Sequence, residues 1–176
     1  MKITNIIKKS FLLLLVFIFI FSLVGCQVNE KTFSGGGLEI KLTSDFKEVE
    51  NALYDIYIIN DQNVAFMSKR YTKHQTIQNV DLSTLTREEY MSFCIANYGW
   101  DATVFSVERP NEEFDSFCYC YYGEYNQTTG EYTYGYMMIV MSDENYFYNI
   151  SLAVPYAKFQ DSKQLLMEYA ISIKVL

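Results

Sequence analysis

Three of the four cysteines in this chain, Cys94, Cys118 and Cys120, are the residues best suited to chemistry. Cys118 and Cys120 are two positions apart in a strand-like segment, so their side chains point to the same face. Their Cα atoms would lie about 6.7 Å apart, at the outer limit for a disulfide. Three thiols that face one another could bind a soft metal, and an exposed thiol of low pKa could serve an enzyme. Cysteine also packs as a small buried hydrophobe, and we favour this interpretation over a disulfide or a metal site.

Other side chains that commonly act in catalysis are present without a matching arrangement. His74 is the only histidine, and it lies in a polar loop with no nucleophile motif beside it. The sequence has no phosphate-binding loop, dinucleotide-binding fingerprint, zinc motif or calcium loop. We therefore predict no catalytic residue, no metal and no cofactor. Acidic pairs occur where a helix start or solvated turns are expected: Glu88-Glu89, Glu112-Glu113 and Asp143-Glu144.

The chain is rich in aromatic residues, with 16 tyrosines and 13 phenylalanines. Tyrosine suits half-buried strand positions, because its ring packs inside while its hydroxyl reaches water. An alternative is a tyrosine-rich sheet face on which a glycan or a peptide stacks. The candidate residues for such a platform are Tyr119, Tyr121, Tyr134, Tyr136, Tyr146 and Tyr148.

The N-terminal residues have the layout of an export signal. Lys2, Lys8 and Lys9 precede an apolar run, Phe11 to Val24, in which Ser22 is the only polar residue. The run is shorter than the roughly 20 apolar residues of a membrane-spanning helix. It ends in Leu23-Val24-Gly25-Cys26, which resembles the bacterial lipobox. This resemblance implies cleavage before Cys26, lipidation of its sulfur, and a lipid-anchored protein on the extracytoplasmic face of the cell membrane. The alternative is an uncleaved N-terminal anchor with an incidental cysteine.

Residues 26–37 are expected to be the lipidated N-terminus and a flexible, glycine-rich tether, followed by a single domain over 38–176. The net charge of −7 becomes −10 when the three signal lysines are removed. So acidic a surface argues against nucleic acid and against direct binding of anionic lipid headgroups. We therefore expect membrane contact through the lipid.

The first half of the domain contains strand patterns and one clear helix. Residues 38–42 alternate apolar and polar, and 54–59 with 64–71 read as a hairpin around a turn of Asn and Asp residues. Thr86 and Glu89 form a capping box, which predicts a helix over about 87–98. Leu85 and Tyr90 stand at the positions of a hydrophobic staple, and Gly99 is the expected stop.

The second half predicts a three-stranded meander and a closing helix. A short strand at 104–108 precedes strand-like segments at 114–125, 131–141 and 146–154. Tyr136 to Met141 is apolar on both faces, so both sides of this strand should be covered. Apolar residues at helical spacing then predict a helix over about 158–171. The order indicates an α+β fold with a central antiparallel sheet of about six strands flanked by helices. The apolar residues whose helical spacing predicts this closing helix are Phe159, Leu165, Leu166, Tyr169, Ala170 and Ile173.

This pattern resembles the PsbP-like fold, and within it the DcrB-type bacterial lipoproteins. The residues that carry the resemblance are Leu38 to Phe46, Leu82 to Tyr90 and Leu166 to Lys174. It implies an α/β/α sandwich and a non-enzymatic accessory or assembly factor, with no catalytic residue to transfer. We therefore expect an envelope lipoprotein that binds a protein partner, with a small-ligand module as the alternative.

Overall fold

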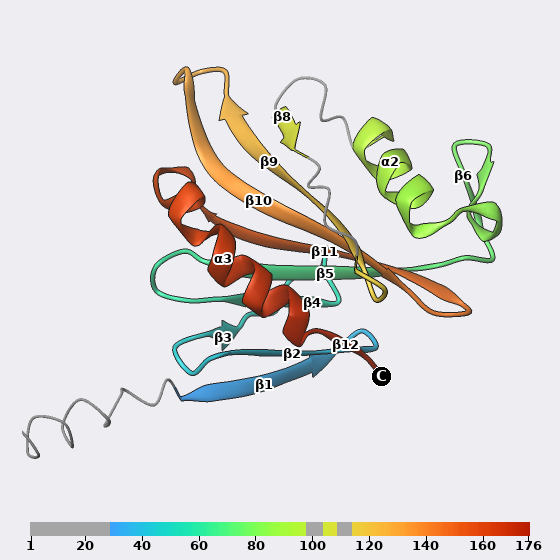
Figure 1. Cartoon of the computed structure of the whole chain (residues 1–176), viewed down its shortest axis with the longest axis horizontal. Coiled ribbons are helices and arrows are strands. Elements are labelled where there is room, and N and C mark those ends of the chain that lie inside the picture. Colours follow the sequence, from blue (N-terminus) through green and yellow to red (C-terminus); the bar gives the residue numbers. More distant parts are fainter. Residues whose placement is uncertain (1–28, 98–103, 109–113) are drawn as a thin grey trace, which may run out of the picture.

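A computed structural model describes residues 29–97, 104–108 and 114–176 of the chain. Within these residues the largest sheet has seven strands, and every neighbouring pair is antiparallel. The meander and the hairpin predicted from the sequence both lie in it, so the predicted α+β class is confirmed (Figure 1). In spatial order the strands are β3 (Lys47–Glu48), β4 (Ile56–Ile59), β5 (Ala65–Thr72), β11 (Tyr146–Pro155), β10 (Glu131–Ser142), β9 (Cys118–Asn126) and β8 (Val104–Glu108).

A smaller sheet contains the start of the described chain. β1 (Glu30–Gly35) pairs with β2 (Leu38–Thr43), and β12 (Lys174–Val175) pairs with the other edge of β2. Gly36 and Gly37 have positive φ values of 55° and 83°, which a tight turn between β1 and β2 requires. The predicted flexible tether is therefore wrong for residues 30–35. Phe33 is only 4% exposed, and burial of its ring holds this strand against the domain.

Two α-helices of the described chain flank the central sheet on opposite faces. α3 (Tyr156–Ser172) lies across one face, and α2 (Arg87–Asn97) covers part of the other (Figure 1). Both were predicted, although α3 begins two residues before the predicted start at 158, and Leu165 is exposed. The predicted capping box of α2 is confirmed: the Thr86 N–H donates to Glu89 Oε2 at 2.8 Å, and the Glu89 N–H donates to Thr86 Oγ1 at 3.2 Å.

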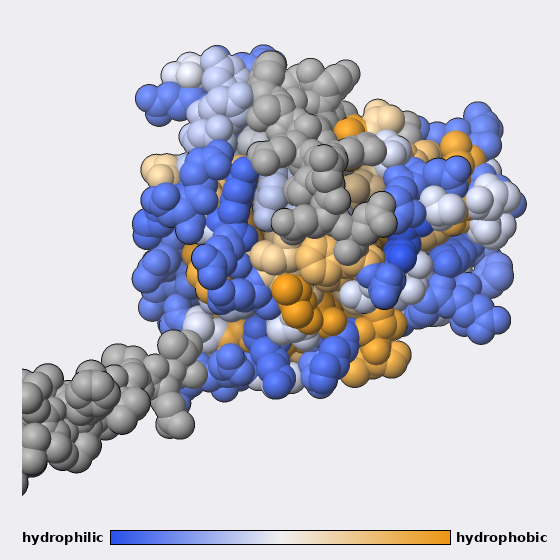
Figure 2. Space-filling model, in the orientation of Figure 1, coloured by the Kyte–Doolittle hydropathy of each residue, from blue (hydrophilic) through white to orange (hydrophobic). Residues whose placement is uncertain are grey.

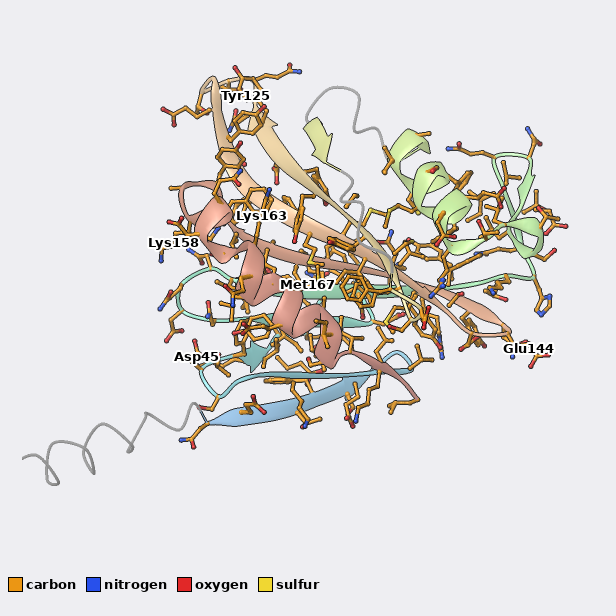
Figure 3. All side chains as sticks on the ribbon, viewed as in Figure 1. Asp45, Tyr125, Glu144, Lys158, Lys163 and Met167 are labelled. Carbon is orange, nitrogen blue, oxygen red and sulfur yellow. The ribbon has the colours of Figure 1, made fainter. Side chains whose placement is uncertain are left out.

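Each face of the sheet has its own apolar core, because side chains alternate along a strand. On β10, Met137 and Ile139 pack in the core under α3, while Met138 and Val140 pack in the core under α2. The prediction that both sides of this strand are covered is thus confirmed. On α3, Lys163 extends over β9, with its Nζ 4.7 Å from the centroid of the Tyr121 ring (Figure 3).

Two short paired strands and a single 3-10 turn lead into α2. β6 (Thr76–Ile77) pairs with β7 (Val80–Asp81), and η1 (Leu82–Thr84) follows directly. Asp81 caps η1, because its carboxylate accepts hydrogen bonds from both the backbone N–H and the hydroxyl of Ser83. These bonds lower the pKa of Asp81. Leu82 is fully buried in the core under α2, so this segment fixes the start of the helix.

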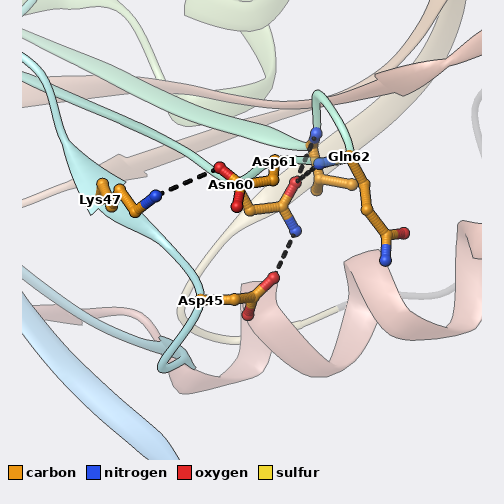
Figure 4. A network of polar contacts seen from close by, with 6 residues as sticks. Asp45, Lys47, Asn60, Asp61 and Gln62 are labelled. Carbon is orange, nitrogen blue, oxygen red and sulfur yellow. Dashed lines mark hydrogen bonds and ion pairs between the residues drawn. The ribbon is translucent and has the colours of Figure 1, made fainter.

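A network of polar side chains joins the β4–β5 turn to the segment that follows β2 (Figure 4). The amide of Asn60 donates to Asp45 Oδ2 at 2.9 Å, and its Oδ1 accepts from the backbone N–H groups of Gln62 and Val64, both at 3.0 Å. Lys47 pairs with Asp61 at 3.2 Å. Because this ion pair is exposed, it contributes little to stability, and the network acts mainly by fixing the turn.

The surface seen over α3 is mostly hydrophilic, with apolar side chains gathered near its centre (Figure 2). Ile171 and Leu176 are among the exposed apolar residues, at 60% and 72%. No helix in the described part of the chain is long and apolar enough to cross a membrane. The predicted signal (1–25), the lipidation site Cys26, the helix stop Gly99 and the Glu112-Glu113 pair lie outside the described residues.

Candidate functional site

The predicted tyrosine platform does not exist as one surface. Tyr119, Tyr121 and Tyr148 are buried in the core under α3, with exposures of 7%, 7% and 2%. Tyr136 lies on the opposite face, where its hydroxyl donates to Glu124 Oε2 at 2.6 Å. Period-two alternation separates these rings, so this prediction is wrong for the platform as defined. Tyr134 and Tyr146 are half-buried at the margins of the sheet.

The cysteines pack in the core under α2. Cys94 and Cys120 are buried and Cys118 is half-buried, and all are thiols. Cys118 and Cys120 share a face of β9, as predicted. Burial, and to a smaller extent the neighbouring Glu88, raise the pKa of Cys118 to about 12. Such a thiol is a poor nucleophile at neutral pH. Within the described residues, no group of His, Cys, Asp and Glu side chains is arranged to hold a metal ion.

His74 and Asp143 have local structural environments. His74 is exposed, and its backbone N–H donates to Thr72 Oγ1 at 3.2 Å. Asp143 closes the β10–β11 turn: its Oδ1 accepts from the N–H groups of Asn145 and Tyr146 at 2.7 and 2.8 Å. The hydroxyl of Tyr148 donates to Asp143 Oδ2 at 2.6 Å. The acidic pair Asp143-Glu144 therefore belongs to a turn, as expected.

The structure contains a pocket that the sequence did not predict, on the sheet face that α2 partly covers. Its floor comes from two central strands, where Met67 pairs with Ser151 and Lys69 with Asn149. Polar residues at the centre of a sheet are unusual, and here they line a cavity of about 340 Å³. We call it the floor pocket. Its size lies at the lower end of the range for small-molecule sites.

Aromatic rings form the walls of the floor pocket. Tyr71 and Tyr122 stand on β5 and β9, and Leu53 and Tyr54 come from the loop before β4. Tyr122 stacks on Tyr136 with centroids 4.7 Å apart, and burial raises its pKa. The pKa of Tyr54 is also raised, by burial first and then by Tyr57 and Tyr71. Tyr54 and Tyr122 are therefore neutral phenols that can stack and donate hydrogen bonds.

A second pocket of about 440 Å³ adjoins the first at Tyr54, which lines both. Glu48, Glu50 and Asp55 line it, together with Tyr57. We call it the acidic pocket, and the two together the Tyr54 groove. Tyr54 stacks on Tyr57, with ring centroids 5.9 Å apart and planes 19° apart. The side chains of the Tyr54 groove are typical of a binding site, because they provide stacking surfaces, hydrogen-bond donors and charged groups.

One feature of the sequence points to the floor pocket, although apolar and polar alternation along the strand does not reveal it. Met67, Lys69 and Tyr71 share a face of β5, and an isolated lysine in the middle of such a face is poorly explained by a fully covered strand. The same face of β11 has Asn149 and Ser151. Only the strand pairing, in which β5 lies beside β11, brings the two polar sets together.

The described elements define the class of this protein as an α+β sandwich with helices on both faces of an antiparallel sheet. The solution structure of cyanobacterial PsbP (CyanoP) from Synechocystis sp. PCC 6803 matches it with a TM-score of 0.59, over 87% of this chain and 95% of that protein. The sequence identity is 14%, so the similarity shows the fold alone. The fold is PsbP-like, as the sequence resemblance implied.

A crystal structure from Bacteroides thetaiotaomicron VPI-5482 is similar at a TM-score of 0.48 and 17% identity, covering 83% of this chain and 48% of that one. This similarity is too weak to carry an argument. No protein-family model matches the sequence, and no curated protein matches it.

Proposed function

We propose that this chain is a lipid-anchored lipoprotein of the cell envelope, whose PsbP-like domain binds a protein partner and catalyses no reaction. The observation that carries the proposal is the Tyr54 groove, where aromatic and charged side chains line adjoining pockets on a rigid sheet. Binding sites are typically preformed hollows of this kind, with a few polar groups that fix orientation.

The anchor is supported by the sequence. The apolar run Phe11 to Val24 and the lipobox-like ending at Cys26 would place the domain on the extracytoplasmic face of the cell membrane. Two or more acyl chains hold a protein stably on a bilayer. A relationship to the DcrB-type lipoproteins within the PsbP-like fold is supported by the segments Leu38 to Phe46, Leu82 to Tyr90 and Leu166 to Lys174.

A non-enzymatic role is supported by the side chains best suited to catalysis. The Cys118 thiol has a pKa raised to about 12 by burial, and His74 is exposed in the loop that follows β5 and is not among the residues that line either pocket.

The floor pocket favours a second candidate function, the binding of a small ligand such as a glycan or a short peptide. Its volume of about 340 Å³ would hold a sugar ring against Tyr54 or Tyr71, with Lys69 and Asn149 as hydrogen-bonding groups. This revises the predicted tyrosine platform, because Tyr54 and Tyr71 take the place of the six tyrosines that defined it.

Site-specific photo-cross-linking in intact cells tests the proposal. A photoreactive phenylalanine replaces Leu53, which is 68% exposed and lines the floor pocket. The matched control places it at Glu144, at the tip of the β10–β11 hairpin (Figure 3). We expect a protein adduct from position 53 only, and its loss in any Cys26→Ala protein that fractionation shows to be released from the membrane. Absence of an adduct at position 53 in correctly localised protein overturns the protein partner in favour of a small ligand.

A further inference from the structure

The two pockets of the Tyr54 groove differ in charge although they share Tyr54. Lys69 lies in the floor pocket, while Glu48, Glu50 and Asp55 line the acidic pocket. Asp55 is held in place, because its Oδ2 accepts from the Arg70 backbone N–H at 2.7 Å. Glu48 and Glu50 are exposed, and among the described residues neither forms a salt bridge. The acidic pocket is therefore suited to a cation.

The stacked pair of Tyr54 and Tyr57 adds a second feature that favours a cation there. Tyr54 is 37% exposed, so the ring pair borders the acidic pocket at the surface. The face of an aromatic ring attracts an ammonium or a guanidinium group, and a guanidinium also stacks on the ring. Aromatic rings beside carboxylates together select an arginine or lysine side chain over a neutral sugar.

The floor pocket offers a different environment to the neighbouring part of a ligand. Met67 and Leu53 provide apolar surface, while Lys69 can donate to a carbonyl oxygen. An extended peptide presents this combination, because its side chains alternate and its backbone carbonyls lie between them. A basic side chain in the acidic pocket and an apolar one over Met67 would satisfy both environments.

We propose that the Tyr54 groove binds an extended peptide segment of a protein partner, with an arginine or lysine of that segment over the Tyr54–Tyr57 ring pair and an apolar side chain in the floor pocket. This inference rests on the proposed function and specifies its ligand. The whole chain, at a net charge of −7, also attracts a basic segment at long range, so the test must separate the groove from general attraction.

Fluorescence anisotropy with the full chain in detergent micelles provides that test. The probe is a labelled hexapeptide of alternating leucine and arginine, and its counterpart has glutamate in place of each arginine. We expect the basic peptide to bind and the acidic peptide to bind at least tenfold more weakly. Tyr54→Ala should weaken binding of the basic peptide about tenfold, whereas Tyr54→Phe, which keeps the ring, should leave it unchanged.

A pair of charge reversals distinguishes the groove from the overall charge. Glu50→Lys and Glu144→Lys change the net charge equally, and both positions are exposed, so neither should unfold the chain. We expect about tenfold weaker binding for Glu50→Lys and no more than a twofold effect for Glu144→Lys. Equal effects of the two reversals, or equal binding of the two peptides, would overturn the inference. The inference would also be overturned if a neutral oligosaccharide displaced the basic peptide completely and if Glu50→Lys did not change the affinity for that oligosaccharide.

The two proposals can fail separately. A cross-link from position 53 together with no preference for the basic peptide would leave the protein partner standing and remove the basic segment as its ligand. Peptide binding at the groove without a cellular cross-link would keep the preference of the groove for a basic peptide, but it would remove the protein partner and leave a free short peptide as the ligand.

Discussion

Burial governs the chemistry of the cysteines at the scale of single residues. Cys94 and Cys120 are fully buried, and the Cys118 thiol has its pKa raised to about 12 by burial. At pH 8 only about one Cys118 in ten thousand would carry the reactive thiolate, roughly a thousandfold less than for a thiol of pKa 9. The side chains that first suggested chemistry are therefore part of a core.

Alkylation with iodoacetamide at pH 8, followed by mass spectrometry of the whole protein, checks this. In the folded full chain we expect Cys94, Cys118 and Cys120 to remain unmodified over a time in which free cysteine reacts completely. In denaturant all of them should react, and a lipidated Cys26 should add no further label. Rapid labelling of the folded chain at Cys118 would contradict the assignment and revive a thiol-dependent activity.

A hydrogen bond between Tyr148 and Asp143 makes stability depend on alkaline pH. Burial and the Asp143 carboxylate raise the pKa of Tyr148 from 10.0 to about 12. Because the unfolded phenol ionises first, this contribution to the free energy of unfolding is complete below pH 10 and is lost between about pH 10 and 12. Tyr148→Phe should therefore flatten the decline measured by urea unfolding over this range, leaving the part due to Tyr122 and Tyr136, whose pKa values are also raised.

Asp143→Asn provides the internal comparison for that measurement. It keeps the shape of the turn residue but removes the carboxylate that helps to raise the pKa of Tyr148. Its decline should lie between those of the natural chain and Tyr148→Phe. Identical declines for all three proteins would show that Tyr148 ionises alike in the folded and unfolded states.

At the scale of elements, the contribution of β1 to stability shows whether residues 30–35 belong to the folded domain or to a flexible tether. Phe33 is 4% exposed in the core under α3, whereas its neighbour Thr32 is exposed. We expect Phe33→Ala to lower the free energy of unfolding by about 3 kcal/mol, as for other buried phenylalanines. Thr32→Ala should change it by less than about 0.5 kcal/mol. Equal, small effects of both substitutions in urea unfolding would restore the tether interpretation.

Helix α3 approaches the sheet closely at Gly135 on β10, where the Phe159 ring lies against the glycine. A methyl group added there would overlap the Phe159 ring of α3, whereas at Gly123 it would press at 2.9 Å on two tyrosine rings. We expect Gly135→Ala to cost about 2 kcal/mol of unfolding free energy, and more than Gly123→Ala, because a buried ring has little room to move.

A second substitution tests whether this overlap is the cause. Phe159→Leu removes part of the ring, so in the Gly135→Ala background it should cost less than it does in the natural chain. Strictly additive losses in thermal or urea unfolding would place the origin of the Gly135→Ala effect elsewhere.

How far each element could be predicted depended on whether its determinants are local. The Thr86–Glu89 capping box and the alternation of β2 are short-range patterns, and both predicted their elements correctly. β1 was missed because Phe33 is the only large apolar residue in its segment, and its strand forms through pairing with β2. The Tyr54 groove was missed because its residues come from separate strands and a loop, and only the strand order brings them together.

At the scale of the whole molecule, charge and sequence support the proposal that a lipid attaches the chain to the membrane. The net charge of −7 includes three lysines of the predicted signal, so the processed chain would be more acidic still, at −10. An acidic domain gains nothing from the negative potential of a bacterial membrane surface. The apolar side chains exposed over α3, such as Ile171, are few, which leaves the acyl chains on Cys26 as the proposed source of membrane affinity.

Cell fractionation tests this with Cys26→Ala against the matched variant Cys118→Ala. We expect the natural chain and Cys118→Ala to stay in the membrane pellet through washes with 1 M salt and with alkaline carbonate, because acyl chains rather than charges hold the protein. Cys26→Ala should lose the acyl chains and incorporation of a labelled palmitate analogue. If the signal is then not cleaved, the Cys26→Ala protein stays in the pellet, and its mass is higher by the mass of residues 1–25. A Cys26→Ala protein of unchanged mass in the pellet would mean that Cys26 is incidental and the N-terminal apolar run is a permanent anchor.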